Sequence, residues 1–135
     1  MSITLTDQDQ LTLRTAAYGA VTLMSAAGAA GSPHRIATDG SIALGSATGL
    51  VGHVLAKSPK VADLNGKSVA EIADRVLPAL TAAMSLLKEQ APAEADNFRG
   101  TVLVAVEAAA RTHQGRPSPT LADMIRKITE ALDAA

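Results

Sequence analysis

Five polar side chains in the first half of the chain have the types that acid–base chemistry needs. His34, Arg35 and Asp39 share one stretch rich in turn-forming residues, and Tyr18 and His53 lie in the predicted helices before and after it. An imidazole near a carboxylate and a guanidinium can move a proton or hold an anion, and loops often carry such sites. We therefore name these five residues as a candidate ligand-binding site. The four residues other than Tyr18 are also those that an enzyme would use if they converged on one cleft.

Other reactive patterns are missing from the sequence. It contains no Cys, which removes disulfides, thiolate nucleophiles and Cys-ligated zinc. Its three histidines lack the i, i+4 spacing typical of a metal site, and Gly66-Lys67-Ser68 lacks the upstream glycine and the strand that a P-loop requires. The acidic pairs fall in predicted first turns of helices, where the helix dipole accounts for them. We therefore expect no catalytic constellation, no metal and no cofactor.

Three glycines mark a second candidate region. Gly45, Gly49 and Gly52 are spaced i, i+4, i+7 and would share one face of a helix predicted over residues 41–57. Each glycine inside a helix costs about 0.5–1 kcal/mol relative to alanine, so the series needs a reason. Either another backbone comes close there or the helix is partly irregular. A close contact would be an internal helix crossing, a slot for a ligand or a subunit interface, and the sequence leaves these three open.

Composition limits the partners that the chain can have. Hydrophobic residues make up 47% of it, with one Tyr, one Phe and no Trp, and the formal net charge is −1. Nucleic-acid binders usually carry a basic face and aromatic platforms, so we expect no nucleic acid. The uncharged run over residues 15–33 consists mostly of small residues, which is a poor membrane span. The absence of a basic signal-peptide region and of Cys agrees with a cytoplasmic protein that has no membrane partner.

Helical periodicity runs through most of the chain, and no alternating strand pattern exceeds about four residues. The first helix should begin near Thr6, because Asp9 three residues later completes an arrangement like a capping box. It should fade over residues 25–31. Its expected core face consists of Leu13, Ala16, Ala17, Ala20, Leu23 and Met24.

The third predicted helix has the clearest start signal. Ser68 and Glu71 form an S-x-x-E capping box at its beginning. Pro78 lies inside the helix and should kink it, because proline removes a main-chain donor and its ring clashes with the preceding turn. The expected core face is Val69, Ile72, Val76, Leu80, Met84 and Leu87.

Two further helices complete the predicted fold. Pro92 suits the first position of the fourth helix, and Gly115 suits the end of it. Ser118-Pro119 starts the fifth helix, with an apolar stripe of Leu121, Ile125, Ile128 and Leu132. The sequence therefore predicts an all-α fold, a single domain over residues 1–135 built as a bundle of about five helices.

Several stretches resemble known families. The segments LTDQDQLTLRTAAYGAV, VLPAL and FRGTVLVAVEAAA are similar to those of uncharacterised, Ala-rich helical proteins of high-GC actinobacteria, a resemblance that implies no activity. Residues 104–132 are similar in layout to the tellurite-resistance TerB-like helical family. Gly115 and Ser118 match that family's acidic turn, but Gln114 and Leu121 replace its acidic residues. The metal role of that family is therefore not carried over.

These observations favour a non-enzymatic function through binding or self-association. A homodimer is a natural expectation, because twofold dimers are the commonest oligomers. We expect the contact surfaces on the glycine-rich second helix and the Ala-rich first helix. The alternative is a carrier or sensor with a small-molecule pocket between helices, where Pro78 and the glycines would leave room.

Overall fold

The computed structural model describes residues 5–27, 49–57, 68–110 and 119–135. These residues form five helices and no strand, which confirms the all-α prediction. None of these helices is long and apolar enough to cross a lipid bilayer. The helices are α1 (Asp7–Ala27), α3 (Gly49–Lys57), α4 (Val69–Gln90), α5 (Pro92–Ala110) and α6 (Pro119–Asp133).

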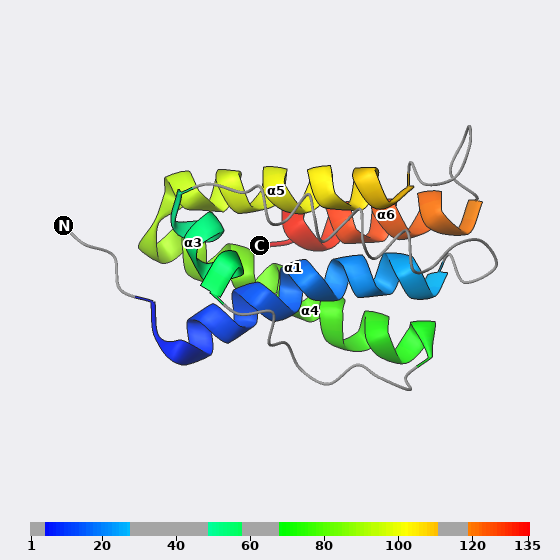
Figure 1. The fold of residues 1–135 in the computed structure, drawn as a ribbon, viewed down its shortest axis with the longest axis horizontal. Helices are drawn as coiled ribbons and strands as arrows, with labels where there is room; N and C mark the ends of the chain where they lie inside the picture. The colour runs from blue at the N-terminus through cyan, green and yellow to red at the C-terminus, as the bar shows by residue number, and fades with distance from the viewer. Residues whose placement is uncertain (1–4, 28–48, 58–67, 111–118) are drawn as a thin grey trace.

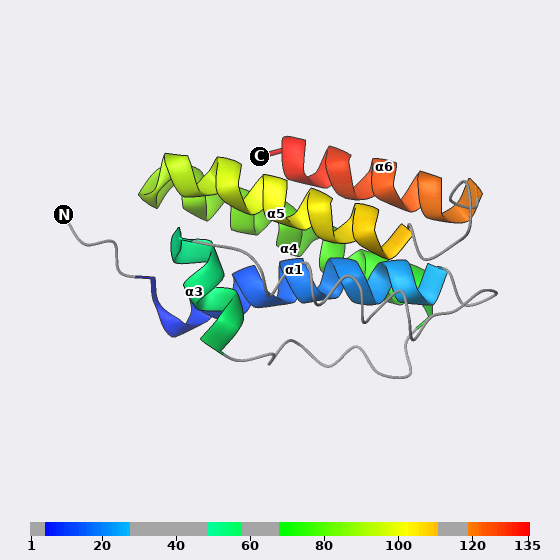
Figure 2. The same ribbon diagram turned by 45° about the horizontal axis from the view of Figure 1, so that its top comes forward.

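Four of these helices, α1, α4, α5 and α6, make up a bundle in which each helix contacts the other three. Figures 1 and 2 show α1 and α5 running in one direction and α4 and α6 running in the other. The short helix α3 contacts α1 and α5 and neither of the other two. It lies at the end of the bundle where α5 begins (Figure 1). We call the four long helices the bundle and treat α3 separately below.

Capping boxes start α1 and α4, as the sequence predicts. In α1, the Asp9 amide donates to Thr6 Oγ1 at 3.0 Å, and the Thr6 amide donates to Asp9 Oδ2 at 3.2 Å. In α4, the Glu71 amide donates to Ser68 Oγ at 3.2 Å, and the Glu71 carboxylate accepts from the Ser68 amide at 3.4 Å. These pairs satisfy main-chain donors that a helix start leaves open. The pKa of Asp9 is lowered by the Thr6 main-chain bond and then by a bond from the Gln90 side chain.

A single residue joins α4 to α5. The Ala91 amide donates to the Leu87 carbonyl at 2.6 Å, and the Ala91 carbonyl accepts from the Glu94 amide at 2.8 Å. Pro92 explains the break, because proline pushes the residue before it out of the helical region. Ala91 has φ −156° and ψ 75°, so α4 ends and α5 turns back at this position.

The core is built from aliphatic side chains around the one Phe of the chain. All six positions predicted for the core face of α1 are completely buried, and so is Phe98 of α5. On α4 the predicted face is buried from Ile72 onward, while Val69 is partly exposed. Small residues let the helices approach: a Cβ added to Gly19 would lie 2.7 Å from Cγ2 of Val76. The Ala-rich face of α1 is therefore interior and does not form the contact surface that we expected there.

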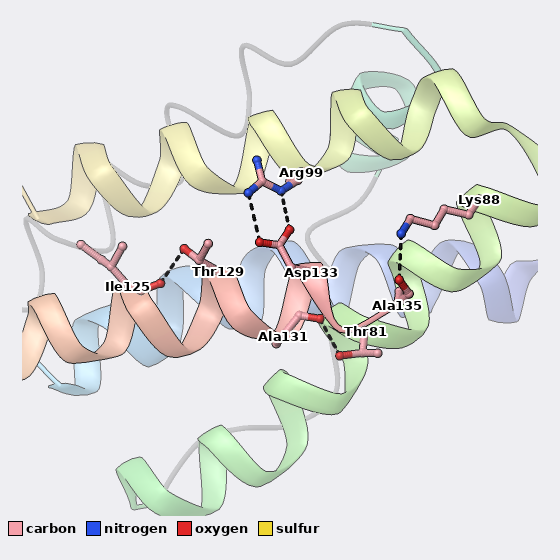
Figure 3. Close-up of polar contacts among 8 residues, drawn as sticks. All are labelled: Thr81, Lys88, Arg99, Ile125, Thr129, Ala131, Asp133 and Ala135. Carbon is pink, nitrogen blue, oxygen red and sulfur yellow. Dashed lines mark hydrogen bonds and ion pairs between the residues drawn. The ribbon is translucent and has the colours of Figure 1, made fainter.

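The end of α6 is held by side chains of α4 and α5 (Figure 3). Thr81 Oγ1 of α4 donates to the main-chain oxygen of Ala131 at 2.7 Å, and Arg99 of α5 pairs with Asp133 through two bonds of 2.8 and 3.3 Å. The carbonyls of a last helical turn have no partner within their own helix, so Thr81 satisfies one of them. The bond from Arg99 lowers the pKa of Asp133.

Two predicted boundaries differ from the structure or extend beyond its described part. The second helix was predicted over residues 41–57, and the described helix α3 begins at Gly49, while residues 41–48 lie outside the described ranges. Helix α5 is described to Ala110, and its predicted end at residues 114–115 also lies outside them.

Candidate functional site

The predicted polar site is only partly within the described residues. His34, Arg35 and Asp39 lie outside them, so their convergence with the other two stays a prediction. His53 is on α3 with its side chain exposed. Tyr18 of α1 is half-buried, and its hydroxyl donates to the carbonyl of Leu55 at 3.1 Å. The Tyr18 side chain therefore binds the main chain of α3, and this hydrogen bond does not involve His53.

The glycine series also divides. Gly45 lies outside the described residues, whereas Gly49 and Gly52 belong to α3. Gly49 is the first residue of the helix and has φ +71°, a left-handed conformation that favours glycine. Periodicity placed it in a helix interior, and that placement is wrong. The sequence also allowed a partly irregular helix, and Gly49 fits that alternative. The chain enters α3 through the left-handed conformation of Gly49, which other residues adopt only at a cost in free energy.

Gly49 also permits a close approach by α5. A Cβ at Gly49 would lie 2.9 Å from Glu94 Oε1 and 3.4 Å from Asn97 Nδ2. Gly52 is buried. The close contact at Gly49 is therefore made with side chains of the same chain.

Glu94 is the residue that sequence reasoning missed. Its carboxylate Oε2 accepts from the amide of Val51 at 3.2 Å and from Asn97 Nδ2 at 3.1 Å. Glu94 thus caps the start of a helix that lies 43 residues earlier in the chain. An acidic side chain at a helix start also interacts favourably with the helix dipole. In the sequence Glu94 sits in the first turn of its own helix, which already explains an acidic residue there, so no local signal links it to α3.

Both ends of α3 are therefore satisfied by other helices. Glu94 of α5 binds an amide in its first turn, and Tyr18 of α1 binds a carbonyl in its last turn. Between these two bonds, Val51, Val54 and Leu55 are buried against the core. We call the pair of side chains Glu94 and Tyr18 the α3 latch.

A second feature is a groove between α1 and α4. It is open to solvent and has a volume of about 460 Å³. Each helix contributes four residues spaced i, i+3, i+4, i+7. The lining residues are Gln8, Leu11, Thr12 and Thr15 of α1, and Arg75, Pro78, Ala79 and Ala82 of α4.

The groove combines an apolar floor with a few polar groups. The guanidinium of Arg75 makes no ion pair within the described part of the chain. In a regular helix the residue at position 78 would donate to the carbonyl of Asp74, and Pro78 cannot do so. The groove therefore offers one cation next to a mostly apolar lining.

The outward face of α5 is the third feature. Beside the exposed Asp96 and Glu107, this side of the helix carries five uncharged residues spaced three or four apart: Ala93, Asn97, Gly100, Val104 and Ala108. We call this set the α5 face. Val104 is 57% exposed, the one large hydrophobic side chain exposed among the described residues. Nothing lies within 4 Å of a Cβ built at Gly100, one turn before it.

The corresponding face of α6 is charged. Arg126 pairs with Asp123 and Glu130, and Lys127 pairs with Asp123 at 3.3 Å. These pairs hold Asp123 at a lowered pKa, mainly through the bond from Arg126. Charged outward faces of this kind are typical of a helix that stays in water. The α5 face differs in that its five residues are uncharged and include an exposed valine, with the carboxylates of Asp96 and Glu107 beside them.

In the described ranges, no three His, Asp or Glu side chains come together as metal ligands would. No protein-family model, no curated protein and no solved structure matches the chain. The resemblances to actinobacterial helical proteins and to the TerB-like family therefore stay predictions, and the function has to be argued from the geometry alone.

Proposed function

We propose that this protein is a small cytoplasmic interaction protein without catalytic activity, and that it self-associates through the α5 face. The observation that carries this proposal is the exposed Val104 beside the open position at Gly100. Large apolar side chains are usually buried, and the bundle leaves Val104 on the outward side of α5 uncovered. A second copy of the chain would cover the other side.

The α5 face is complementary to itself. A twofold axis makes each copy use the same patch, so a protruding side chain must meet its own recess on the partner. Val104 protrudes and Gly100 leaves a recess one turn away. In two antiparallel α5 helices, each Val104 would lie over the Gly100 of the other copy. Packed helices cross at an angle and diverge from the contact, so Asp96 and Glu107 beside the face would stay in water.

The test is the oligomeric state of two variants with a matched control. Val104→Glu places a charge in the proposed contact, and Gly100→Leu fills the recess. Ala70→Glu adds the same charge at an exposed position on α4. We expect a wild-type dimer and an Ala70→Glu dimer by native mass spectrometry and sedimentation, and monomers for the other two variants. Circular dichroism should remain that of a folded helical protein in all four.

Two results would contradict self-association through this face. One is a wild-type protein that stays monomeric up to about 1 mM, where even a dimer with millimolar Kd is well populated. The other is a Val104→Glu variant that dimerises as tightly as the wild type.

The groove between α1 and α4 supports a second candidate, a carrier or sensor for a small ligand. Its volume of about 460 Å³ lies in the range of small-molecule pockets. An apolar floor next to Arg75 fits an apolar molecule that carries an anionic group. Native mass spectra of freshly purified protein would then show a persistent added mass, and Arg75→Ala would lose it. A bare polypeptide mass in fresh preparations would speak against this candidate.

A further inference from the structure

We propose that α3 is a displaceable cap on the bundle, and that its docking is controlled by the α3 latch, Glu94 and Tyr18. This inference does not depend on self-association through the α5 face. It rests on how the ends of α3 are satisfied and on which helices α3 contacts.

The first argument is the length of α3. It spans nine residues, Gly49–Lys57. Isolated helices shorter than about 12–15 residues are marginal in water, because forming the first turn fixes several dihedral angles for a single hydrogen bond. Gly49, the first of these residues, has φ +71° and is therefore not in the right-handed helical conformation. The helical form of α3 therefore depends on its contacts with the bundle.

The second argument is that a polar contact with the bundle holds each end of α3. A helix start leaves amides open and a helix end leaves carbonyls open. In α3 the Val51 amide is satisfied by Glu94 at 3.2 Å, and the Leu55 carbonyl is satisfied by Tyr18 at 3.1 Å. Both partners belong to the bundle, so undocking of α3 breaks both bonds at once. Loss of either bond therefore weakens the docked state as a whole.

The third argument is that the four bundle helices contact one another directly, without α3 between them. Every pair among α1, α4, α5 and α6 is in contact, and α3 contacts only α1 and α5. Undocking of α3 thus leaves all six helix pairs of the bundle intact. Elements with few contacts open locally, at a lower free energy than global unfolding.

Undocking would uncover a site that fits another helix. The side of α1 and α5 that now receives Val51, Val54 and Leu55 is apolar, and the Glu94 carboxylate stands at its edge. An acceptor at that position suits the open amides of a helix start. In the closed form α3 itself occupies this site, and undocking would expose its apolar surface and the Glu94 carboxylate.

The test is hydrogen exchange of the full chain, measured residue by residue by NMR. The amides of residues 53–57 report on α3, and those in the middle of α4 and α6 report on the bundle. We expect the α3 amides of the wild type to exchange much faster than the bundle amides. In Glu94→Ala they should exchange about tenfold to hundredfold faster still, the size expected for a lost charge-assisted hydrogen bond. Bundle amides should stay much slower than the α3 amides and should accelerate by no more than the same factor, because global unfolding also breaks this bond.

Matched variants separate the latch from general stability. Glu89→Ala removes an exposed carboxylate from α4 and should leave α3 exchange unchanged. Tyr18→Phe keeps the ring and removes the donor, and should accelerate α3 by about tenfold or less, since a neutral bond is weaker. Glu94→Gln keeps an acceptor without the charge and should fall between the wild type and Glu94→Ala.

Three results would overturn the proposal. Wild-type α3 amides that exchange as slowly as those of the bundle would show that α3 opens only by global unfolding. Acceleration of the bundle amides in Glu94→Ala without acceleration of the α3 amides would show that Glu94 supports the bundle and not the docking of α3. Unchanged α3 exchange in both Glu94→Ala and Tyr18→Phe would show that the latch does not hold the cap.

Discussion

Helices α3 and α6 are held to their neighbours by the same device, yet they differ in how much else holds them. In both, side chains of other helices satisfy main-chain groups at the helix ends: Glu94 and Tyr18 at α3, and Thr81 at α6. Helix α6 also buries Leu121, Met124, Ile128 and Leu132 and contacts all three other helices of the bundle. Among the side chains of α3 whose burial is described, three aliphatic ones are buried, and the helix contacts two helices of the bundle.

This difference determines what happens when a hydrogen bond at the end of a helix is lost. Where apolar burial is extensive, as in α6, a lost hydrogen bond lowers the stability of the whole fold by a small fraction. Where a helix is short and lightly buried, as in α3, the same loss shifts a local equilibrium between docked and undocked states. Four substitutions test this contrast, and they are ordered here from the largest expected effect to the smallest.

The largest effect should come from Ile128→Ala in α6. Ile128 is fully buried, so the substitution should lower the free energy of unfolding by about 2–5 kcal/mol. Urea denaturation followed by circular dichroism measures this value. The matched change in α3, Val54→Ala, removes fewer atoms and should act mainly on the exchange of α3 amides. A Val54→Ala variant that is destabilised globally as much as Ile128→Ala would erase the distinction between the two helices.

Gly49→Ala should come next. The left-handed φ of +71° costs a non-glycine residue about 1–2 kcal/mol, and the new Cβ would press on the Glu94 carboxylate. We expect faster exchange of α3, while the bundle amides stay much slower and accelerate by no more than the same factor. The control is Gly100→Ala, where nothing lies within 4 Å of the added Cβ and helix propensity should raise stability by about 0.5–1 kcal/mol. Gly49→Ala should therefore destabilise the docked form of α3, and Gly100→Ala should stabilise the protein. A change of the same sign in both variants would argue against this account of Gly49.

Thr81→Val should lower the free energy of unfolding by about 1 kcal/mol, because it removes the donor to the Ala131 carbonyl. Thr129→Val is the control in the same region (Figure 3). Thr129 donates to the Ile125 carbonyl within its own helix, a bond that contributes little to tertiary structure. Denaturant midpoints of the two variants should therefore differ, with Thr81→Val the lower.

The smallest effect should be the acid dependence contributed by Asp133. Its pKa is lowered in the folded protein by Arg99, so it contributes stability above its unfolded value near 3.8. That contribution is lost as the pH falls through the folded value. Asp133→Asn should therefore flatten part of the stability loss between about pH 5 and pH 2. The effect is small because the pair is exposed, and urea midpoints of wild type and variant across that range measure it.

The sequence predicted those parts of the fold whose signals are local. The capping boxes at Thr6 and Ser68 and the proline starts at Pro92 and Pro119 lie where expected, because each depends on residues within one turn. Apolar spacing likewise found the core face of α1. It did not tell whether this Ala-rich face would serve an internal crossing or a contact between subunits, since small residues suit both equally well.

The candidate site was less accessible to prediction. Glu94 acts on an amide 43 residues away, so its role exists only in the folded chain. Gly49 fits a helical period, yet its φ is set by the entry into α3. The five residues of the α5 face can be read from the sequence, but only the packing of α5 shows that they point outward. His34, Arg35 and Asp39 remain a prediction, because they lie outside the described residues.

The close approach at Gly19 has a consequence for how this chain can vary. A Cβ there would lie 2.7 Å from Val76 Cγ2, so the spacing between α1 and α4 is set by the sum of the two side-chain volumes. Close-packed interiors cannot absorb an extra methyl group without a shift. Positions 19 and 76 should therefore change together in evolution, one gaining volume as the other loses it. Two substitutions that are each harmful would then be tolerated as a pair.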